Sequence, residues 1–572
     1  MHLPSLSTPI MPNCHLLLVL GLTIIIFSVY QDVFTHSFVA YDDTRIVVNR
    51  SQHYSGITIK NLRAIAWDDF PREEPLVLRD LSYLINAQIF SPLNPQGYLL
   101  GNLLLHILVS YLVFVLALTL FPGQTVLATL AAIAFAVHPM HCEAVAWVSA
   151  RKDTLYTSLY LLAVLAYVHF HRSSRVAHLV GSAILFIAAL FSKSAAISFL
   201  PFLLSYRLIM LKGRRISLPE TIYTISVALV TVWYIQWYSG VLREYGILRS
   251  SVVGLSRDWG SWALVSMESL FFYVTKLLYP SHLSITYSFP APGLASKNPL
   301  FLTLTILSFL VLGALLWRHR KDLNHKVILL TAWFFCGLLP YLDLTPVGIY
   351  VANRYAYLSS IPFIIGVIWL VLTVKRGIRS GLTSSPIIVA LLIATPLVIL
   401  SRQTMTAVKA WRNTESLWEN ARQQDPNNLA PYVALMGDYL RQYLEAPDRP
   451  HSSPLLDKAA EIGGVAMARF SYGKGQYERA LHLVTAQLGQ IACYRGDYQK
   501  ANDFFKLTFQ LNPDYIKGRY IYATVLAEQQ RNQEAIQQLS AILTPSRRPI
   551  DQGIIWEASI LHASLTKNQS SQ

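Results

Sequence analysis

The chain has 572 residues, of which 53% are hydrophobic and only 14% are charged, whereas soluble globular proteins carry about 25% charged residues. The deficit lies in one part of the chain: residues 1–401 hold 28 Lys or Arg and 16 Asp or Glu, while the much shorter segment 402–572 holds 19 and 16. This composition excludes a wholly soluble protein, a disordered chain and a disulfide scaffold. The four cysteines are widely scattered and show neither disulfide nor metal-ligand spacing.

Most of the net charge of +15 belongs to residues 1–401, where four short basic loops separate apolar segments. The cations of these loops are Arg172, Arg175, Lys212, Arg214, Arg215, Arg318, Arg320, Lys321, Lys326, Lys375, Arg376 and Arg379. Only one acid, Asp322, accompanies them. Such loops typically face the cytoplasm. Because no basic face or nucleic-acid-binding motif accompanies the charge, we expect no nucleic-acid partner.

Twelve apolar segments are candidate membrane helices, since about 20 apolar residues span a bilayer. They are residues 14–32, 97–121, 124–141, 154–171, 176–192, 194–211, 217–238, 262–280, 299–317, 326–343, 357–374 and 385–401. The loops 212–215 and 318–326 are both basic, so an even number of crossings must separate them. We therefore interpret 262–280, which carries Glu268 and Lys276, as an interfacial or re-entrant helix. No Lys or Arg precedes the first segment, which we read as an anchor rather than a signal peptide. The prediction is an all-α membrane bundle of about eleven spans, with a cytoplasmic N-terminus and an extracytoplasmic tail.

The tail has the pattern of a short helical repeat. The segment Gly496–Ala501 is followed by a similar one at Asn532–Ala535, and Ala501 and Ala535 are 34 residues apart, which is the tetratricopeptide period. An irregular unit at Gly475–Ala480 does not fit that period, so the array is short and degenerate. Such solenoids usually bind peptides or partner proteins; the alternative is that this one caps the membrane domain. We therefore predict a membrane domain at 1–401 and a tetratricopeptide-like α-solenoid at 402–572.

Two adjacent carboxylates, Asp42 and Asp43, directly follow the first apolar segment. Neighbouring carboxylates repel each other, and they are retained where they bind a cation or where one of them acts as a base. The alternative is the solvated start of a loop.

A second motif, His138-Pro139-Met140-His141-Cys142-Glu143, lies where Pro139 should end the third apolar segment, and Asp153 follows ten residues after Glu143. The spacing of His138, His141 and Glu143 is compatible with a metal site. It is equally compatible with a hydrogen-bonding cluster that positions a substrate, or with polar residues at a membrane interface.

Two cations in apolar surroundings are the remaining candidate site residues. Lys193 lies between two apolar segments, where it is costly unless it reaches the surface or pairs with an anion such as a lipid phosphate. Arg354 offers a planar fork suited to phosphate, and its neighbours Tyr355 and Tyr357 also match an interfacial aromatic belt.

The expected topology places all four groups on one face of the membrane. That arrangement suits transfer from a phosphate-linked donor in the membrane, with a carboxylate deprotonating an acceptor hydroxyl and the cations stabilising the departing phosphate.

These segments resemble those of the transmembrane and tetratricopeptide-repeat (TMTC-like) protein O-mannosyltransferases, members of the GT-C superfamily of lipid-linked sugar transferases. The resemblance rests on Asp42-Asp43, His138 to Trp147, Arg151 to Leu155, Ser192-Lys193, Lys276 to Pro280 and Arg354 to Leu358. Asn353 departs from the family pattern, which usually has Glu at that position.

The resemblance implies an inverting transferase with a polyprenyl- or dolichyl-phosphate sugar, plausibly mannose, as donor and a Ser/Thr hydroxyl of an exported protein as acceptor. It implies Asp42 and Asp43 as catalytic residues, and His138, His141, Glu143 and Asp153 as organisers of the acceptor pocket. Lys193, Arg354, Tyr355 and Tyr357 would bind the donor phosphate, and the tail would recruit the acceptor.

Several alternatives stay open on the sequence alone. The enzyme could transfer a whole oligosaccharide, or could act on a lipid or glycan; a non-enzymatic membrane scaffold is the second alternative. The motifs identify no particular cofactor, and a divalent cation is an open alternative. The expected location is a bacterial inner membrane or the endoplasmic reticulum membrane, with the site and tail on the periplasmic or lumenal side.

Overall fold

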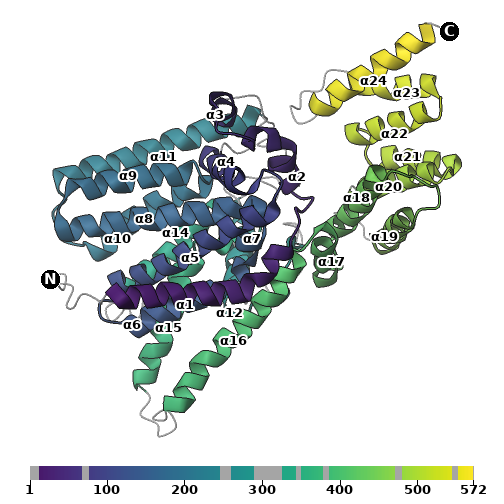
Figure 1. Cartoon of the computed structure of the whole chain (residues 1–572). Helices are drawn as coiled ribbons and strands as arrows, with labels where there is room; N and C mark the ends of the chain where they lie inside the picture. The colour runs from purple at the N-terminus through teal and green to yellow at the C-terminus, as the bar shows by residue number, and fades with distance from the viewer. Residues whose placement is uncertain are drawn as a thin grey trace. The chain divides into compact units, whose positions relative to one another are not determined.

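The computed structural model describes residues 12–66, 76–244, 259–288, 325–342, 349–377, 386–470, 480–543 and 552–570. All regular structure within these ranges is helical, which confirms the all-α prediction (Figure 1). The chain divides into two compact units. The larger comprises Met1–Gly240, Ser251–Ile285 and Pro292–Asn413, and the smaller comprises Val241–Ser250, Thr286–Ala291 and Thr414–Gln572.

Three of the described helices are long and apolar enough to cross a membrane. They are His15–Thr35, which includes most of α1 (Pro12–Tyr30), α5 (Pro95–Leu120), and Leu218–Arg243 within α11 (Leu218–Glu244). α5 begins cleanly because Pro95 needs no hydrogen-bond acceptor in the first turn and the Asn94 side chain accepts from the Gly97 N–H at 3.1 Å.

A further candidate for a membrane segment is a bent pair of helices, which is either a broken span or a re-entrant loop. α6 (Thr125–Ala136) and the segment Pro139–Ala146 pass the same criteria together but are bent by 52° at the break between them. The bend follows from the sequence, because Pro139 cannot donate to the preceding turn. The break exposes a short non-helical stretch at which polar side chains can gather.

The other candidate segments that the structure describes are also helical. They are α8 (Arg151–Ser173), α9 (Val176–Leu190), α10 (Phe199–Met210), α12 (Trp259–Leu278), α14 (His325–Leu338), α15 (Ser360–Gly377) and α16 (Pro386–Ala410). The candidate 299–317 lies outside the described residues, so the count of eleven spans stays a prediction. α16 continues through the predicted domain boundary at 401/402.

Short helices form the connections between these longer ones. They are η1 (Gln31–Thr35), α2 (Asp43–Ile46), η2 (Val48–Tyr54), α3 (Ile59–Ala66), α4 (Val77–Phe90), η3 (Pro139–His141), α7 (Cys142–Ala146), η4 (Val148–Ala150), η5 (Ser194–Ser198), η7 (Leu339–Tyr341) and η8 (Asn353–Ala356). α7 packs against α5, α8, α16 and η8, so this connection is a buried junction of the larger unit.

In the smaller unit, each helix packs against the next along the chain. These helices are α17 (Thr414–Gln424), α18 (Leu429–Glu445), α19 (Pro454–Phe470), α20 (Leu481–Tyr494), α21 (Tyr498–Leu511), α22 (Ile516–Glu528), α23 (Asn532–Leu543) and α24 (Gln552–Ser570). Ala501 and Ala535, the two residues that set the expected repeat, are buried at equivalent points near the starts of α21 and α23. Most of the irregular unit at 475–480 lies outside the described residues.

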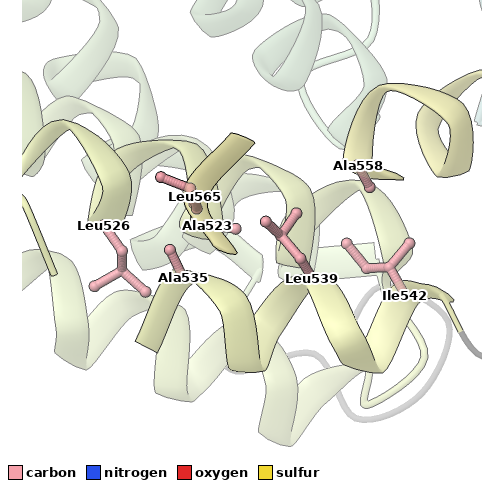
Figure 2. Close-up of a cluster of buried hydrophobic side chains, with 7 residues drawn as sticks. All are labelled: Ala523, Leu526, Ala535, Leu539, Ile542, Ala558 and Leu565. Atoms are coloured by element: carbon pink, nitrogen blue, oxygen red, sulfur yellow. The ribbon is translucent and has the colours of Figure 1, made fainter. Parts of the chain in front are cut away.

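Figure 2 shows the hydrophobic cluster formed by α22, α23 and α24. Its members are Ala523, Leu526, Ala535, Leu539, Ile542, Ala558 and Leu565. The alanines let the three helices approach closely around Leu539, which is fully buried.

Candidate functional site

The two adjacent aspartates occupy different environments in the structure. Asp43 is buried, and its carboxylate accepts hydrogen bonds from the Val39 N–H at 3.1 Å, the Ser149 N–H at 3.0 Å and the Ser149 hydroxyl. The side chain of Asp42 is 29% exposed and lies 3.6 Å from the guanidinium of Arg45. Asp43 therefore joins two loops, whereas Asp42 is the carboxylate that a substrate can reach.

The burial of Asp43 has an electrostatic consequence. Burial raises the pKa of Asp43 from 3.8 to about 6, although the hydrogen bonds from Ser149 and Val39 favour the ionised form. The nearby Asp42 carboxylate raises it further. Because its pKa is higher when folded than when unfolded, this group destabilises the fold progressively as the pH rises from about 4 to about 6.

We expect Ser149→Ala to destabilise the protein more at about pH 8 than at about pH 5. Above the Asp43 pKa the hydroxyl donates to a charged acceptor, a bond worth about 1.5–3 kcal/mol, whereas below it the bond is neutral and worth about 1 kcal/mol. The loss of stability at each pH is measured as the difference in thermal unfolding midpoint between variant and wild type. Ser158→Ala is the matched control, because the Ser158 hydroxyl donates to the uncharged carbonyl of Leu155. Equal losses at both pH values would show that Asp43 does not titrate between them.

The two histidines of the second motif make hydrogen bonds to the surrounding helices. His138 Nε2 lies 3.1 Å from the carbonyl oxygen of Leu277 in α12, and its Nδ1 accepts from the Met140 N–H. His141 Nδ1 lies 2.7 Å from the carbonyl oxygen of Phe135, and its Nε2 lies 2.8 Å from the Ser360 hydroxyl in α15. All four ring nitrogens thus contact protein groups, and in the described ranges no three His, Cys, Asp or Glu side chains come together as metal ligands. In this structure both histidines therefore act as hydrogen-bonding groups that link the break after α6 to α12 and α15.

Glu143, from α7, forms an ion pair with Arg354, from η8. The Arg354 backbone N–H also donates to Glu143 Oε2 at 3.3 Å. The guanidinium carbon of Arg354 lies 5.4 Å from the ring centre of Trp147 and 4.9 Å from that of Tyr355. Both charged side chains are buried, so each is the main counter-charge of the other.

Asp153, in the first turn of α8, forms the second buried ion pair with Lys193. The Lys193 ammonium also faces three aromatic rings, with ring centres 5.6 Å (Tyr156), 5.2 Å (Tyr341) and 5.4 Å (Tyr355) away. Burial alone would favour the neutral amine, but the Asp153 carboxylate outweighs it and the pKa of Lys193 is raised. Asp153 Oδ2 is buried and has no hydrogen-bond partner among the described residues.

The two ion pairs belong to one cluster. Tyr355 lies beside both cations, and its ring stacks on Tyr341 with centres 4.1 Å apart. Arg354 is near enough to Asp153 and Lys193 to interact electrostatically with both. We call Glu143, Arg354, Asp153 and Lys193 the charged quartet.

The first loop reaches the charged quartet through Tyr41. Its ring lies 5.3 Å from that of Trp147, and its hydroxyl interacts electrostatically with Arg354 and Glu143. Burial raises the pKa of Tyr41 to about 12, so the hydroxyl stays protonated at neutral pH. Asp42 follows Tyr41 directly in the chain and interacts electrostatically with the Tyr41 hydroxyl, so Tyr41 lies between this partly exposed carboxylate and the charged quartet.

Tyr357 lies between the charged quartet and the histidines, because it interacts electrostatically with Asp153 and its ring lies 5.0 Å from that of His141. It is fully buried, and its hydroxyl lies 2.7 Å from Nδ1 of His106 on α5. The structure thus brings together Glu143, Asp153, Lys193, Arg354 and Tyr355 of the predicted residues, with Tyr357 within electrostatic range of Asp153. Asp42 and Asp43 follow Tyr41 in the neighbouring loop, and His138 and His141 bond to the surrounding helices.

Sequence reasoning did not single out several residues of the site. Tyr41, Trp147, Tyr156 and Tyr341 surround the cations, but aromatic residues near span ends are equally typical of membrane interfaces. Arg151 was visible only as part of a motif. In the structure it is a buried clamp that donates to Asn102 Oδ1 at 2.9 Å and to Asn86 Oδ1 at 2.7 Å, tying α8 to α5 and α4.

The fold and this site define a helical membrane protein with buried carboxylate–cation pairs next to an accessible aspartate. The chain is similar to the protein O-mannosyl-transferase Tmtc1 of Drosophila melanogaster, with 32% identity over 189 residues, 31% of this chain and 21% of that protein. It is also similar to the protein O-mannosyl-transferases TMTC1 of Mus musculus (40% over 88 residues, 15% and 9%) and Tmtc2 of Drosophila melanogaster (43% over 93 residues, 16% and 10%). These similarities confirm the resemblance read from the motifs, and they span about a fifth or less of the relatives' length. No family model matches the chain.

Proposed function

We propose that this protein is an inverting glycosyltransferase of the membrane that moves a sugar, plausibly mannose, from a polyprenyl- or dolichyl-phosphate donor to a Ser/Thr hydroxyl of an exported protein. The observation that supports the proposal is the charged quartet, in which residues from four separate segments meet and interact with Tyr41, the residue that precedes Asp42. The protein O-mannosyl-transferases to which the chain is similar support the same class of reaction.

Asp42 is the general base in this proposal. It takes the proton of the acceptor hydroxyl as the acceptor oxygen bonds to the anomeric carbon and the bond from that carbon to the phosphate oxygen breaks. Attack opposite the leaving phosphate inverts the anomeric configuration. Asp43 holds the Asp42 backbone in place through Ser149 and Val39, and so acts as a positioning residue.

Lys193 and Arg354 neutralise the departing phosphate. Each already has a carboxylate partner, so the phosphate shares these cations with Asp153 and Glu143. Sharing is stereochemically feasible because an arginine has five N–H donors and a lysine three. Tyr355 keeps both cations aligned, and His138, His141 and Tyr357 support the walls of the pocket.

The proposal also includes the membrane topology and the two domains. We propose about eleven spans in a GT-C type domain at 1–401, and a tetratricopeptide-like tail at 402–572 that recruits the acceptor protein. The site and the tail would face the periplasm or the lumen of the endoplasmic reticulum.

Purified protein in liposomes, supplied with a panel of labelled polyprenyl-phosphate sugars and an acceptor peptide, tests the proposal. We expect transfer, or slow hydrolysis of the donor, by wild type and neither by the Asp42→Asn, Asp43→Asn double variant. Equal signals from both proteins would remove the aspartates from the mechanism. Reaction only with an oligosaccharide donor, or only on a lipid acceptor, would replace the proposed substrates.

A further inference from the structure

A second charged region lies at the other end of α8 from the charged quartet. α8 begins at Arg151 and ends at Ser173, and its 23 residues span about 34 Å at 1.5 Å per residue. This length is close to the hydrocarbon thickness of a bilayer, about 30 Å. Five cations of this region lie in the last turn of α8 and in the connections that follow α8 and α10: Arg172, Arg175, Lys212, Arg214 and Arg215. We call this region the basic end.

A buried acid ties the helices of the basic end together. Glu220, in the first turn of α11, accepts a hydrogen bond from the Tyr167 hydroxyl of α8 at 3.2 Å. The same carboxylate oxygen lies 3.5 Å from Arg207 Nε of α10 and 3.8 Å from His171 Nε2 of α8. Three helices therefore meet around one carboxylate.

This network also brings the two basic connections together. Arg207 donates to the carbonyl oxygens of Leu211, at 2.8 Å, and of Arg214, which folds the connection between α10 and α11 back over α10. Arg172 is in the last turn of α8 and Arg214 is in the connection that follows α10, yet both interact electrostatically with Tyr206. The cations thus form one patch rather than two separate loops.

The patch is exposed, and residues 154–243, which carry all its cations, contribute no surface acid. Arg175, Lys212, Arg214 and Arg215 are all exposed. Between residues 154 and 243 the chain has a single acid, Glu220, which is buried and already bound. The positive potential of the patch therefore faces outward.

Large apolar side chains project right beside these cations. Leu208, Ile216 and Leu218 are 72%, 57% and 73% exposed, and Val176 is 50% exposed directly after Arg175. A soluble acidic protein or a nucleic acid would leave these apolar groups in water. A phospholipid matches both parts, since its headgroup carries a negative charge and its acyl chains cover apolar side chains.

We propose that the basic end binds the headgroups of anionic phospholipids, with Arg175, Lys212, Arg214 and Arg215 contacting the phosphates and the adjacent apolar side chains contacting the acyl chains. Glu220, Tyr167 and Arg207 position the patch by holding its two connections together. This inference is independent of the proposed transfer reaction, because no residue of the basic end belongs to the charged quartet.

The test uses the full chain in a neutral detergent, titrated with phosphatidylglycerol or phosphatidylcholine and followed by native mass spectrometry. Each exposed cation is expected to contribute about fivefold in affinity. The triple variant Arg175→Gln, Lys212→Gln, Arg215→Gln should therefore bind phosphatidylglycerol roughly a hundredfold more weakly than wild type. The matched control Lys506→Gln, Lys517→Gln, Lys567→Gln removes the same charge from the smaller unit and should leave binding unchanged.

Three outcomes would overturn the proposal. They are equal phosphatidylglycerol binding by the triple variant and wild type, equal wild-type affinity for phosphatidylcholine, and displacement of the lipid by inorganic phosphate at comparable concentration, which would indicate a site for free anions. If the triple variant fails to fold, lipid binding by the wild-type protein alone still tests the proposal. Its phosphatidylglycerol affinity must fall steeply with added potassium chloride while its phosphatidylcholine affinity stays constant.

Discussion

Asp42→Asn is expected to lower the rate of sugar transfer by a factor of about 10²–10⁴, the usual contribution of a general base. An asparagine of the same shape cannot accept the proton of the acceptor hydroxyl. Because Asp42 is partly exposed and its described charged partner is Arg45 on the surface, the variant should fold and should bind the donor as wild type does. Transfer in liposomes and binding of the labelled donor measure the two effects separately.

Asp32→Asn is the matched control, since it removes a partly exposed carboxylate from η1, at the end of the first candidate span, and should leave the rate unchanged. Asp43→Asn should act differently, because an amide placed against the Val39 and Ser149 donors leaves a buried N–H group facing another donor. Its main effect is therefore expected on the unfolding midpoint. One result would reverse the two roles. In it, Asp42→Asn transfers sugar at a rate within a few-fold of wild type, while Asp43→Asn loses transfer but keeps its unfolding midpoint.

Lys193→Met is expected to destabilise the protein by about 3–5 kcal/mol, the usual cost of leaving one member of a buried ion pair without its counter-charge. The charge left behind is that of Asp153, one of whose oxygens already has no hydrogen-bond partner among the described residues. The double variant Lys193→Met, Asp153→Asn removes both charges and should recover most of this stability. Neither variant should bind the donor, because the phosphate loses a cation in both.

Thermal unfolding in detergent and binding of a labelled polyprenyl-phosphate sugar separate these two effects. Lys152→Met provides the control, since Lys152 precedes Asp153 in α8 but is only half-buried and lies outside the charged quartet. Donor binding by the double variant at wild-type affinity would show that Lys193 serves the fold alone, and the phosphate would then have to be assigned to Arg354.

Much of the fold follows from local sequence patterns. The apolar segments predicted α1, α5 and α11 because a run of about 20 apolar residues can bury its backbone only as a helix in a membrane. Pro139 explained why α6 ends where it does. The repeat spacing placed Ala501 and Ala535 at matching points of two helices, because small residues recur wherever helix pairs pack closely.

The candidate site was predictable as a set of motifs but not as a geometry. Aspartates, histidines, Lys193 and Arg354 stand out in apolar surroundings because isolated charges there are costly. The local sequence does not reveal which carboxylate pairs with which cation. Glu143 and Arg354 are separated by 211 residues along the chain, and Asp153 and Lys193 by 40. The sequence assigned both cations to a phosphate, whereas the fold supplies each with a carboxylate first.

By itself, the sequence determined that this protein is helical, that it is a membrane protein, and which polar groups stand out in its apolar segments. These properties depend on composition and short-range periodicity, which are local. Only the tertiary structure decided that Asp42 is accessible and Asp43 is buried, although the two are adjacent in the chain. The distinction arises because Ser149, 106 residues away, donates to one carboxylate and not to the other. Burial and counter-charges are set by packing between distant segments, and no local pattern encodes them.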